Sequence, residues 1–327
     1  MLKLKHKDLI TGEELGADEV AALLTLAQKL KDQREQGFGA GVLQGKTLAM
    51  LFDKPSLRTR FSFTVAMQEL GGHVVESVAE TRKQEEPEDL ARVLSGYCHG
   101  IMIRTFGEEQ VTRMAESAHI PVINGLSNEF HPCQALADLL TMQQAFGKLK
   151  GLRLAYIGDG NNILQSFFPL AEKVGLQIAF ACPSGYGPKS RLYEKFNKSG
   201  LLKSYDNPAQ AVKGADVVYT DVWTSMGFEK EYAERITAFQ GFQVNEELLA
   251  KSGKDTKVMH CLPMVRGQEI SHTLPDAPSS LIFAQSENRL HVQKALLIGL
   301  LAEKNHGISN KNTKGVSFGK GEKSVSP

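Results

Sequence analysis

The chain has 327 residues, of which 42% are hydrophobic and 23% charged, and its formal net charge is +1. This composition excludes an intrinsically disordered chain, and the length suggests two domains of about 150 residues each. A balance so close to neutral argues against a general electrostatic attraction to nucleic acid or to a membrane, so we expect neither as a partner.

The four cysteines are scattered and form no CxxC pair. Such a pattern fits neither a zinc site nor a disulfide framework and indicates a reducing compartment. Met1 to Asp8 contains no apolar core of a secretory signal, and no run of 18 or more apolar residues occurs. We therefore expect a cytoplasmic protein without a membrane span and without a metal site.

Hydrophobic periodicity predicts a regular alternation of strands and helices along the chain. The predicted helices cover residues 18–33, 60–70, 86–97, 108–118, 132–146, 163–174, 191–199, 209–214, 229–239 and 288–304. The predicted strands cover residues 47–52, 73–77, 101–104, 121–124, 152–157, 176–181, 217–220 and 257–260.

This alternation is typical of parallel sheets with helices on their faces. We expect an α/β protein made of two doubly wound parallel-sheet domains joined by long helices, with the active site in the cleft between them. The predicted first domain covers residues 1–140 and the second covers 141–288. Residues 289–306 are expected to form a C-terminal helix that packs back on the first domain. Residues 307–327 are poor in apolar side chains and are expected to be a disordered tail.

The segment from Phe52 to Arg60 joins a predicted strand to a predicted helix and contains Ser56, Arg58 and Thr59. Unpaired backbone N–H groups at a helix start attract anions, and arginine can hold a phosphate or carboxylate with two parallel hydrogen bonds. This stretch therefore predicts a phosphate site. The alternative is a serine-capped helix with solvated arginines.

Further polar side chains follow other predicted strands, at the sheet edge where α/β proteins bind ligands. Arg104 ends one strand, and His131 and Gln134 open the long helix that follows another. A histidine can donate to a carbonyl oxygen, and a glutamine can both donate and accept, which suits an amide-like group. Taken singly, Arg104 also fits a surface ion pair and His131 a helix cap.

In the second half, Asp221 follows a strand and precedes the loop Ser225 to Gly227, where a carboxylate could receive a cationic amine. His260 to Pro263 also lies at a strand end, and its Leu-Pro bond is a candidate for the cis form. Alone, Cys261 is more typical of a small buried residue than of a nucleophile.

The glycine-rich turn Gly158 to Asn162 raises the possibility of a dinucleotide site. However, Ile163 stands where the third glycine of G-x-G-x-x-G would be, and no acidic residue clearly ends the next strand. We therefore discount a nicotinamide cofactor, and the two asparagines could instead hold a carboxylate or an amino group.

Four motifs occur in a fixed order: Ser56-Leu57-Arg58-Thr59-Arg60, His131-Pro132-x-Gln134, Asp221-x-x-x-Ser225-Met226-Gly227 and His260-Cys261-Leu262-Pro263. Together they closely resemble the ornithine carbamoyltransferases, within the aspartate/ornithine carbamoyltransferase family, over roughly residues 1 to 305. The resemblance implies transfer of the carbamoyl group of carbamoyl phosphate to the side-chain amine of L-ornithine, giving L-citrulline and phosphate by direct attack. It implies no cofactor and a homotrimer. A role in arginine biosynthesis is expected, although the motifs do not separate it from ornithine regeneration.

The resemblance also implies a role for each matching residue, with residues 1–140 binding carbamoyl phosphate and 141–288 binding ornithine. The carbamoyl phosphate site would comprise Ser56, Leu57, Arg58, Thr59, Arg104, His131, Gln134 and Arg289. The ornithine site would comprise Asn162, Asp221, Ser225, Met226, Cys261 and Leu262. The catalytic groups would be Arg104, His131, Asp221 and Cys261.

Two departures from the family pattern stand out. Leu57 replaces the usual threonine, so one hydroxyl contact is lost. Thr81 stands where the family carries a glutamine that reaches a neighbouring subunit's site, and Arg82, Lys83 and Gln84 are the candidates to replace it.

Parts of the sequence also allow three other functions. A related acceptor, putrescine or an N-acylornithine, is the alternative substrate. A non-catalytic subunit would be expected to lack Arg58, His131 or Asp221, and all three are present. A nucleotide-dependent oxidoreductase would need a dinucleotide site at the turn Gly158 to Asn162, where the third glycine of the fingerprint is missing.

Overall fold

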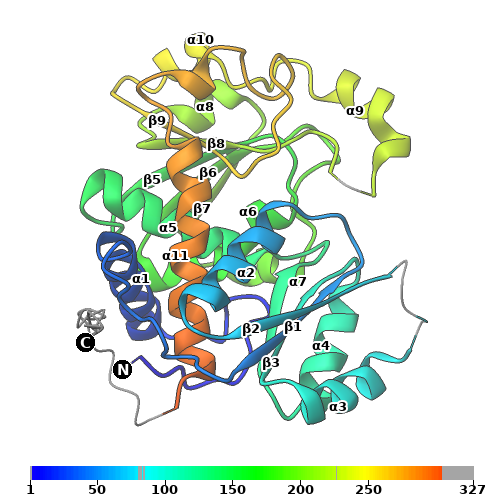
Figure 1. The fold of residues 1–327 in the computed structure, drawn as a ribbon. Coiled ribbons are helices and arrows are strands. Elements are labelled where there is room, and N and C mark those ends of the chain that lie inside the picture. Colours follow the sequence, from blue (N-terminus) through cyan, green and yellow to red (C-terminus); the bar gives the residue numbers. More distant parts are fainter. Residues whose placement is uncertain (1, 80–82, 84, 226, 304–327) are drawn as a thin grey trace, which may run out of the picture.

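The computed structural model describes residues 2–79, 83, 85–225 and 227–303, which form two parallel sheets with helices packed on both faces of each (Figure 1). The strand order is β2-β1-β3-β4 in the first sheet and β7-β6-β5-β8-β9 in the second. Every pairing between neighbouring strands is parallel. The expected α/β fold with two parallel sheets is confirmed.

The first sheet holds β1 (Thr47–Phe52), β2 (His73–Val78), β3 (Gly100–Arg104) and β4 (Val122–Leu126). The helices of this half are α1 (Ala17–Asp32), α2 (Arg58–Glu69), α3 (Pro87–Tyr97) and α4 (Glu108–Ser117). β1 and β3 are apolar runs buried on both faces, as central strands of a parallel sheet are. Alternate residues face opposite ways, so Leu51 and Ile103 pack under α3 and α4, while Met50 and Met102 face α2 and the central core.

The second sheet holds β5 (Arg153–Ile157), β6 (Gln177–Ala181), β7 (Leu202–Tyr205), β8 (Val217–Thr220) and β9 (Lys257–His260). The helices of this half are α6 (Asn162–Val174), α7 (Arg191–Asn197), α8 (Pro208–Val212), α9 (Tyr232–Ala238) and α10 (Glu246–Ala250). Between the two halves, α5 (Pro132–Phe146) contacts β4, α6 and α11. Tyr156 and Tyr219 face the same central core as the first sheet, and Ala155 and Val218 face a separate cluster with α8. The central core therefore joins the inner faces of both sheets.

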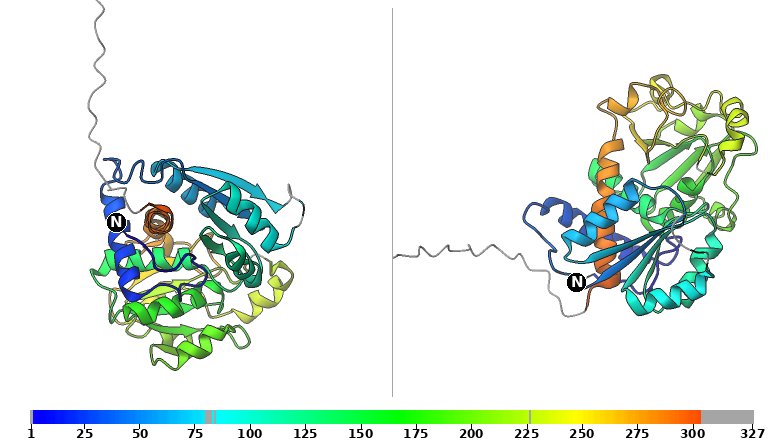
Figure 2. Two further views of the ribbon diagram at one scale, coloured as in Figure 1. Left: turned by 90° about the horizontal axis from the view of Figure 1, so that it is seen from below. Right: turned by 45° about the vertical axis from the view of Figure 1, so that its right-hand side comes forward.

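The last helix, α11 (Ile282–Leu301), runs from the second sheet past the first and contacts α5, α1 and α2 (Figure 1). Viewed along its axis it lies beside α1 and is covered by neighbouring elements (Figure 2). Its buried face includes polar residues as well as the apolar Val292, Leu296 and Ile298. Because α11 touches both halves, it can hold their facing edges at a defined separation.

The largest differences from the expectations concern three elements. β7 and α10 had not been predicted, because both are very short and mixed in polarity. α11 begins at Ile282 instead of Asn288. The predicted tail, residues 307–327, lies outside the described residues, and the exact domain boundary at residue 140 stays a prediction. Among the helices of the described chain, none combines the length and apolar character needed to cross a membrane.

Candidate active site

A cavity of about 1100 Å³ lies where the carboxyl ends of both sheets face each other. Of the predicted site residues, the structure brings together in its wall Ser56, Leu57, Arg58, Thr59, Arg104, His131, Gln134, Asn162, Asp221, Ser225, Cys261, Leu262 and Arg289. Met226 lies outside the described residues, as do Thr81, Arg82 and Gln84. Lys83 is described and exposed, and it does not line this cavity.

One end of the cavity carries a cluster of guanidinium groups. Arg58 is the first residue of α2, Arg104 ends β3, and Arg289 comes from α11. The Thr59 hydroxyl oxygen accepts a hydrogen bond of 2.8 Å from Arg289 Nη2, and Arg104 Nη1 lies 3.5 Å away from it. These three cations, together with the N–H groups at the start of α2, form a site for a multiply charged anion.

Burial lowers the pKa of each guanidinium group in this cluster. Burial, followed by the positive charges of Arg289 and Arg58, lowers the pKa of Arg104 to about 9. Burial also lowers the pKa of Arg289 to about 10 and that of Arg58 below its usual value. A bound dianion would stabilise all three charged forms at once, because an opposite charge within a few ångströms favours ionisation.

The second arginine of the motif has a different environment. Arg60 pairs with Glu76 of β2 and lies over the Phe52 ring, 5.4 Å from its centroid, and it does not line the cavity. Successive residues of a helix point roughly 100° apart around its axis. Arg60, two residues after Arg58, therefore faces a different side of α2.

His131 and Gln134 open α5 beside the guanidinium cluster, and both are buried. Burial, and then the charges of Arg289, Arg104 and Arg58, holds the pKa of His131 far below 6.5. The imidazole is therefore neutral and has a single N–H to donate. The backbone N–H of His131 donates to Ser166 Oγ at 2.6 Å, which ties the start of α5 to α6.

The opposite end of the cavity centres on the carboxylate of Asp221, which follows β8. Its Oδ2 accepts from Asn161 Nδ2 at 2.7 Å. Its Oδ1 accepts from the Val222 N–H at 2.8 Å and from the Cys261 thiol at 3.0 Å. A buried carboxylate held in this way favours a ligand with an ammonium or amine group.

Two further residues of the cavity wall are Asn161, one of the asparagine pair considered in the sequence analysis, and Lys54, which was not singled out there. Asn161 orients Asp221 and is itself fixed by Tyr156, whose hydroxyl donates to Asn161 Oδ1 at 3.0 Å. Lys54 Nζ donates to Asn128 Oδ1 at 2.5 Å, and burial followed by the charge of Arg104 lowers the pKa of Lys54 to about 8. Lys54 lies within the segment from Phe52 to Arg60 that predicts a phosphate site, so its position in the sequence could have identified it as a candidate.

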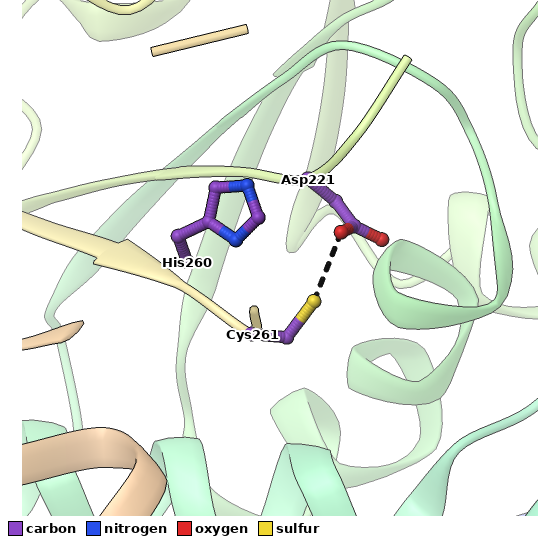
Figure 3. Close-up of side chains that lie close together, drawn as sticks. All are labelled: Asp221, His260 and Cys261. Atoms are coloured by element: carbon purple, nitrogen blue, oxygen red, sulfur yellow. Dashed lines mark hydrogen bonds between the residues drawn. The ribbon is translucent and has the colours of Figure 1, made fainter. Parts of the chain in front are cut away.

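The donor atoms of Asp221, His260 and Cys261 lie within 4.8 Å of one another (Figure 3). Both ring nitrogens of His260 already have partners, because Nδ1 accepts from the Leu262 N–H at 2.9 Å and Nε2 lies 3.0 Å from Glu269 Oε1. The histidine thus has no free lone pair for a metal, and its role is to shape the loop that carries Cys261. The Leu262-Pro263 bond in this loop is cis.

Cys261 has the properties of a hydrogen-bond donor and not of a thiolate. Burial and the adjacent Asp221 carboxylate raise the pKa of the thiol well above 9. We expect Cys261→Ser, which keeps a donor, to retain activity within about tenfold of the wild type, and Cys261→Ala to lose more. Steady-state kinetics of the two variants would check this. Equal losses in both would show that the hydrogen bond to Asp221 is unimportant.

The α/β architecture and a cavity that combines a guanidinium cluster on one side with a carboxylate on the other are typical of an enzyme that binds two substrates. The family model of the aspartate/ornithine carbamoyltransferase carbamoyl-P binding domain matches residues 7–144, and that of the Asp/Orn binding domain matches residues 150–300. The chain belongs to the aspartate/ornithine carbamoyltransferase family.

Relatives within this family carry a more specific name. An ornithine carbamoyltransferase of Anoxybacillus flavithermus is 48% identical over 92% of this chain and 98% of its own length, and one of Bacillus subtilis is 45% identical over 94% and 97%. The solved ornithine carbamoyltransferase of Pyrococcus furiosus is 42% identical, with a TM-score of 0.87 over 92% of this chain and 99% of that one.

Proposed function

We propose that this protein is an ornithine carbamoyltransferase that converts carbamoyl phosphate and L-ornithine to L-citrulline and phosphate. The observation that carries the proposal is the pairing, in one cavity, of three guanidinium groups with a buried carboxylate. The first set suits a phosphate dianion, and the second suits the side-chain amine of an amino acid.

In the proposed mechanism, Arg58, Thr59 and Arg289 bind the phosphate group. Arg104 and His131 donate to the carbonyl oxygen, on which negative charge develops during attack. A neutral His131 can donate without adding charge, and burial among arginines keeps it neutral.

The amine of ornithine, with a pKa of about 10.4 like that of lysine, is mostly protonated at neutral pH and must lose a proton before it attacks. Asp221 holds this amine, Asn162 and Ser225 contact the rest of the amino acid, and Cys261 and Leu262 close the site. Once the ammonium has released one proton to solvent, the nitrogen lone pair attacks the carbonyl carbon and the C–O bond to phosphate breaks. The departing phosphate takes the second proton, which the nitrogen loses as the C–N bond forms. Much of the rate comes from holding two reactants together.

The test is citrulline formation by the purified protein, with ornithine, putrescine and N-acetylornithine compared as acceptors. We expect ornithine to be used with the highest kcat/KM. A higher kcat/KM with putrescine or N-acetylornithine would replace the acceptor in the proposal, and no product with any of the three would refute it.

We propose that residues 1–140 bind carbamoyl phosphate and that 141–288 bind ornithine, and the descriptions of the family models matching 7–144 and 150–300 support this division. We also propose a cytoplasmic enzyme of arginine biosynthesis. Its four cysteines are all free, and a 34% identical relative from Campylobacter jejuni is described as anabolic. The role would be tested by expressing this protein in an arginine auxotroph that lacks the activity and measuring its growth without arginine.

A homotrimer is the assembly we propose, and the surface of the first half supports an interface there. β2 is an edge strand of the first sheet, and its Val75 is 59% exposed. Leu57 and Phe61, at the start of α2, are 67% and 62% exposed. An edge strand near exposed apolar side chains favours association with another chain.

We expect Phe61→Glu to convert the trimer to smaller species in light scattering coupled to size exclusion. The matched control is Tyr232→Glu, which puts the same charge on a side chain of the second half that is 48% exposed. A Phe61→Glu variant that remains trimeric would place the interface elsewhere.

A further inference from the structure

Below the guanidinium cluster lies a fully buried polar network that the mechanism above does not use. Its centre is the carboxylate of Asp138, on α5 one turn after Gln134, and it reaches Tyr219 on β8 and Gln285 on α11. Asp138, Gln285 and Tyr219 are 0% exposed and Gln134 is 1% exposed. Buried polar groups are costly unless their partners are satisfied, so the geometry of this network is strongly constrained.

Three donors converge on the Asp138 carboxylate. Its Oδ1 accepts from Gln134 Nε2 at 2.8 Å and from Gln285 Nε2 at 2.7 Å, and its Oδ2 accepts from the Tyr219 hydroxyl at 3.0 Å. An ionised carboxylate can only accept hydrogen bonds. The amide nitrogen of Gln134 must therefore face Asp138.

Gln285 fixes the polarity of the network independently. Its Oε1 accepts from the backbone N–H of His260 at 3.0 Å, and a backbone N–H can only donate. The oxygen of Gln285 thus faces His260, and its nitrogen faces Asp138 Oδ1 and the Tyr219 oxygen, which is 2.9 Å away. Oδ1 of Asp138 must remain an acceptor.

The consequence appears at the cavity. Because Nε2 of Gln134 is turned toward Asp138, the amide oxygen is the atom left for a ligand. This Oε1 is buried and has no hydrogen-bond partner in the described part of the chain, and Gln134 lines the cavity beside His131 and Arg104. A buried acceptor without a partner favours a ligand that donates a hydrogen bond to it.

We propose that Asp138 is a positioning residue that sets the amide orientation of Gln134 and thereby makes the site select an –NH2 group over a methyl group on the carbonyl carbon of the substrate. The proposal rests on the proposed function, since carbamoyl phosphate carries that –NH2 and acetyl phosphate carries a methyl in its place. A methyl group would leave the Gln134 oxygen buried and unsatisfied, whereas the carbamoyl –NH2 donates to it.

The state of charge of Asp138 does not alter this geometry. Burial raises the pKa of Asp138 to about 7, and a proton on Oδ2 would point to the Tyr219 oxygen while Oδ1 still accepts from both amides. In Asp138→Asn the side-chain oxygen can take the place of Oδ1 and the nitrogen that of Oδ2, so the acceptor for both amides is kept. An apolar residue of similar size provides no acceptor, so the Gln134 amide would be free to turn.

The experiment compares two stable ligands by calorimetry. Phosphonoacetamide carries –NH2 on the carbonyl carbon, and acetonylphosphonate carries a methyl there; in both a CH2 replaces the bridging oxygen. We expect the wild type to prefer the amide by about thirtyfold, and Asp138→Leu to prefer it by no more than about threefold. Asp138→Asn should keep the wild-type ratio, and so should the control Tyr219→Phe, which removes only the donor to Oδ2.

A merely structural role would lower the melting temperature of Asp138→Leu and leave the ratio of the two dissociation constants unchanged, and that result would overturn the proposal. Loss of selectivity in Asp138→Asn would overturn it as well. If the leucine variant does not fold, Asp138→Ala takes its place, because a water that fills the space can donate as readily as it accepts and sets no orientation.

The measurement needs no ornithine and therefore stands apart from citrulline formation. A wild type that prefers phosphonoacetamide to acetonylphosphonate but makes no citrulline would contradict the proposed function and leave this inference standing. A wild type that binds neither would contradict the carbamoyl phosphate site and, with it, this inference.

Discussion

Replacing Arg58 by methionine is expected to lower kcat/KM for carbamoyl phosphate by about 10²–10³, because it removes a charged donor from a preorganised anion site. Methionine keeps part of the apolar stem, so the loss is chiefly that of the guanidinium group. Arg58 lines the cavity at the start of α2, where burial lowers its pKa, so a bound anion would stabilise its charged form. Initial-rate kinetics, together with the inhibition constant of product phosphate, would measure the effect.

The matched control is Arg60→Met, two residues further along the same helix. Arg60 pairs with Glu76 and lies outside the cavity wall, so this variant should keep kcat/KM within about threefold of the wild type, as surface ion pairs contribute little. If Arg60→Met matched the loss in Arg58→Met, the phosphate site would not be the one described. Circular dichroism and the oligomeric state would be compared in both variants.

Replacing Asp221 by asparagine is expected to raise KM for ornithine by about a hundredfold or more, with little change in the binding of carbamoyl phosphate. The substitution keeps the shape of the side chain and removes the negative charge. An ammonium group placed in the cavity would then be desolvated without its counter-ion, and breaking a buried charge pair from one side is costly. Full kinetics with each substrate varied in turn would separate the two effects.

Asp255→Asn is the control, since this carboxylate belongs to the same half of the chain but its side chain is 83% exposed and pairs with Lys257. It should behave as the wild type. An Asp221→Asn variant that loses affinity for carbamoyl phosphate instead of ornithine would place the amine elsewhere in the cavity.

The sequence was sufficient for most of the fold because its long elements have clear periodicity. The central strands are continuous apolar runs, and helices such as α1 bury one regular face. β7, by contrast, is a four-residue edge strand with two exposed polar residues, and it exists because β6 offers it a partner. The first turns of α11 contain the buried Gln285, whose polarity concealed them from a search for apolar faces.

For the site, the motifs were sufficient to choose candidates but not to assign their geometry. Arg58 and Arg60 look equivalent in the sequence, and only the direction of each side chain from α2 separates them. Asp138 and Gln285 are 147 residues apart and make their contact through tertiary packing. No local pattern reports such a pairing, so the residues that orient Gln134 could be found only in the structure. The roles of the individual site residues stay predictions.

The two sheets divide the chemistry in a way that bears on how acceptor preference can change. The groups proposed to bind carbamoyl phosphate come from the loop after β1, the start of α2, the end of β3, the start of α5, and α11, whereas Asp221 and Cys261 follow β8 and β9. A different amine could therefore be accommodated by changing short loops of the second sheet, while the residues proposed to bind carbamoyl phosphate stay unchanged. This division makes the scaffold suited to diversification and gives protein engineers a defined set of loops to randomise.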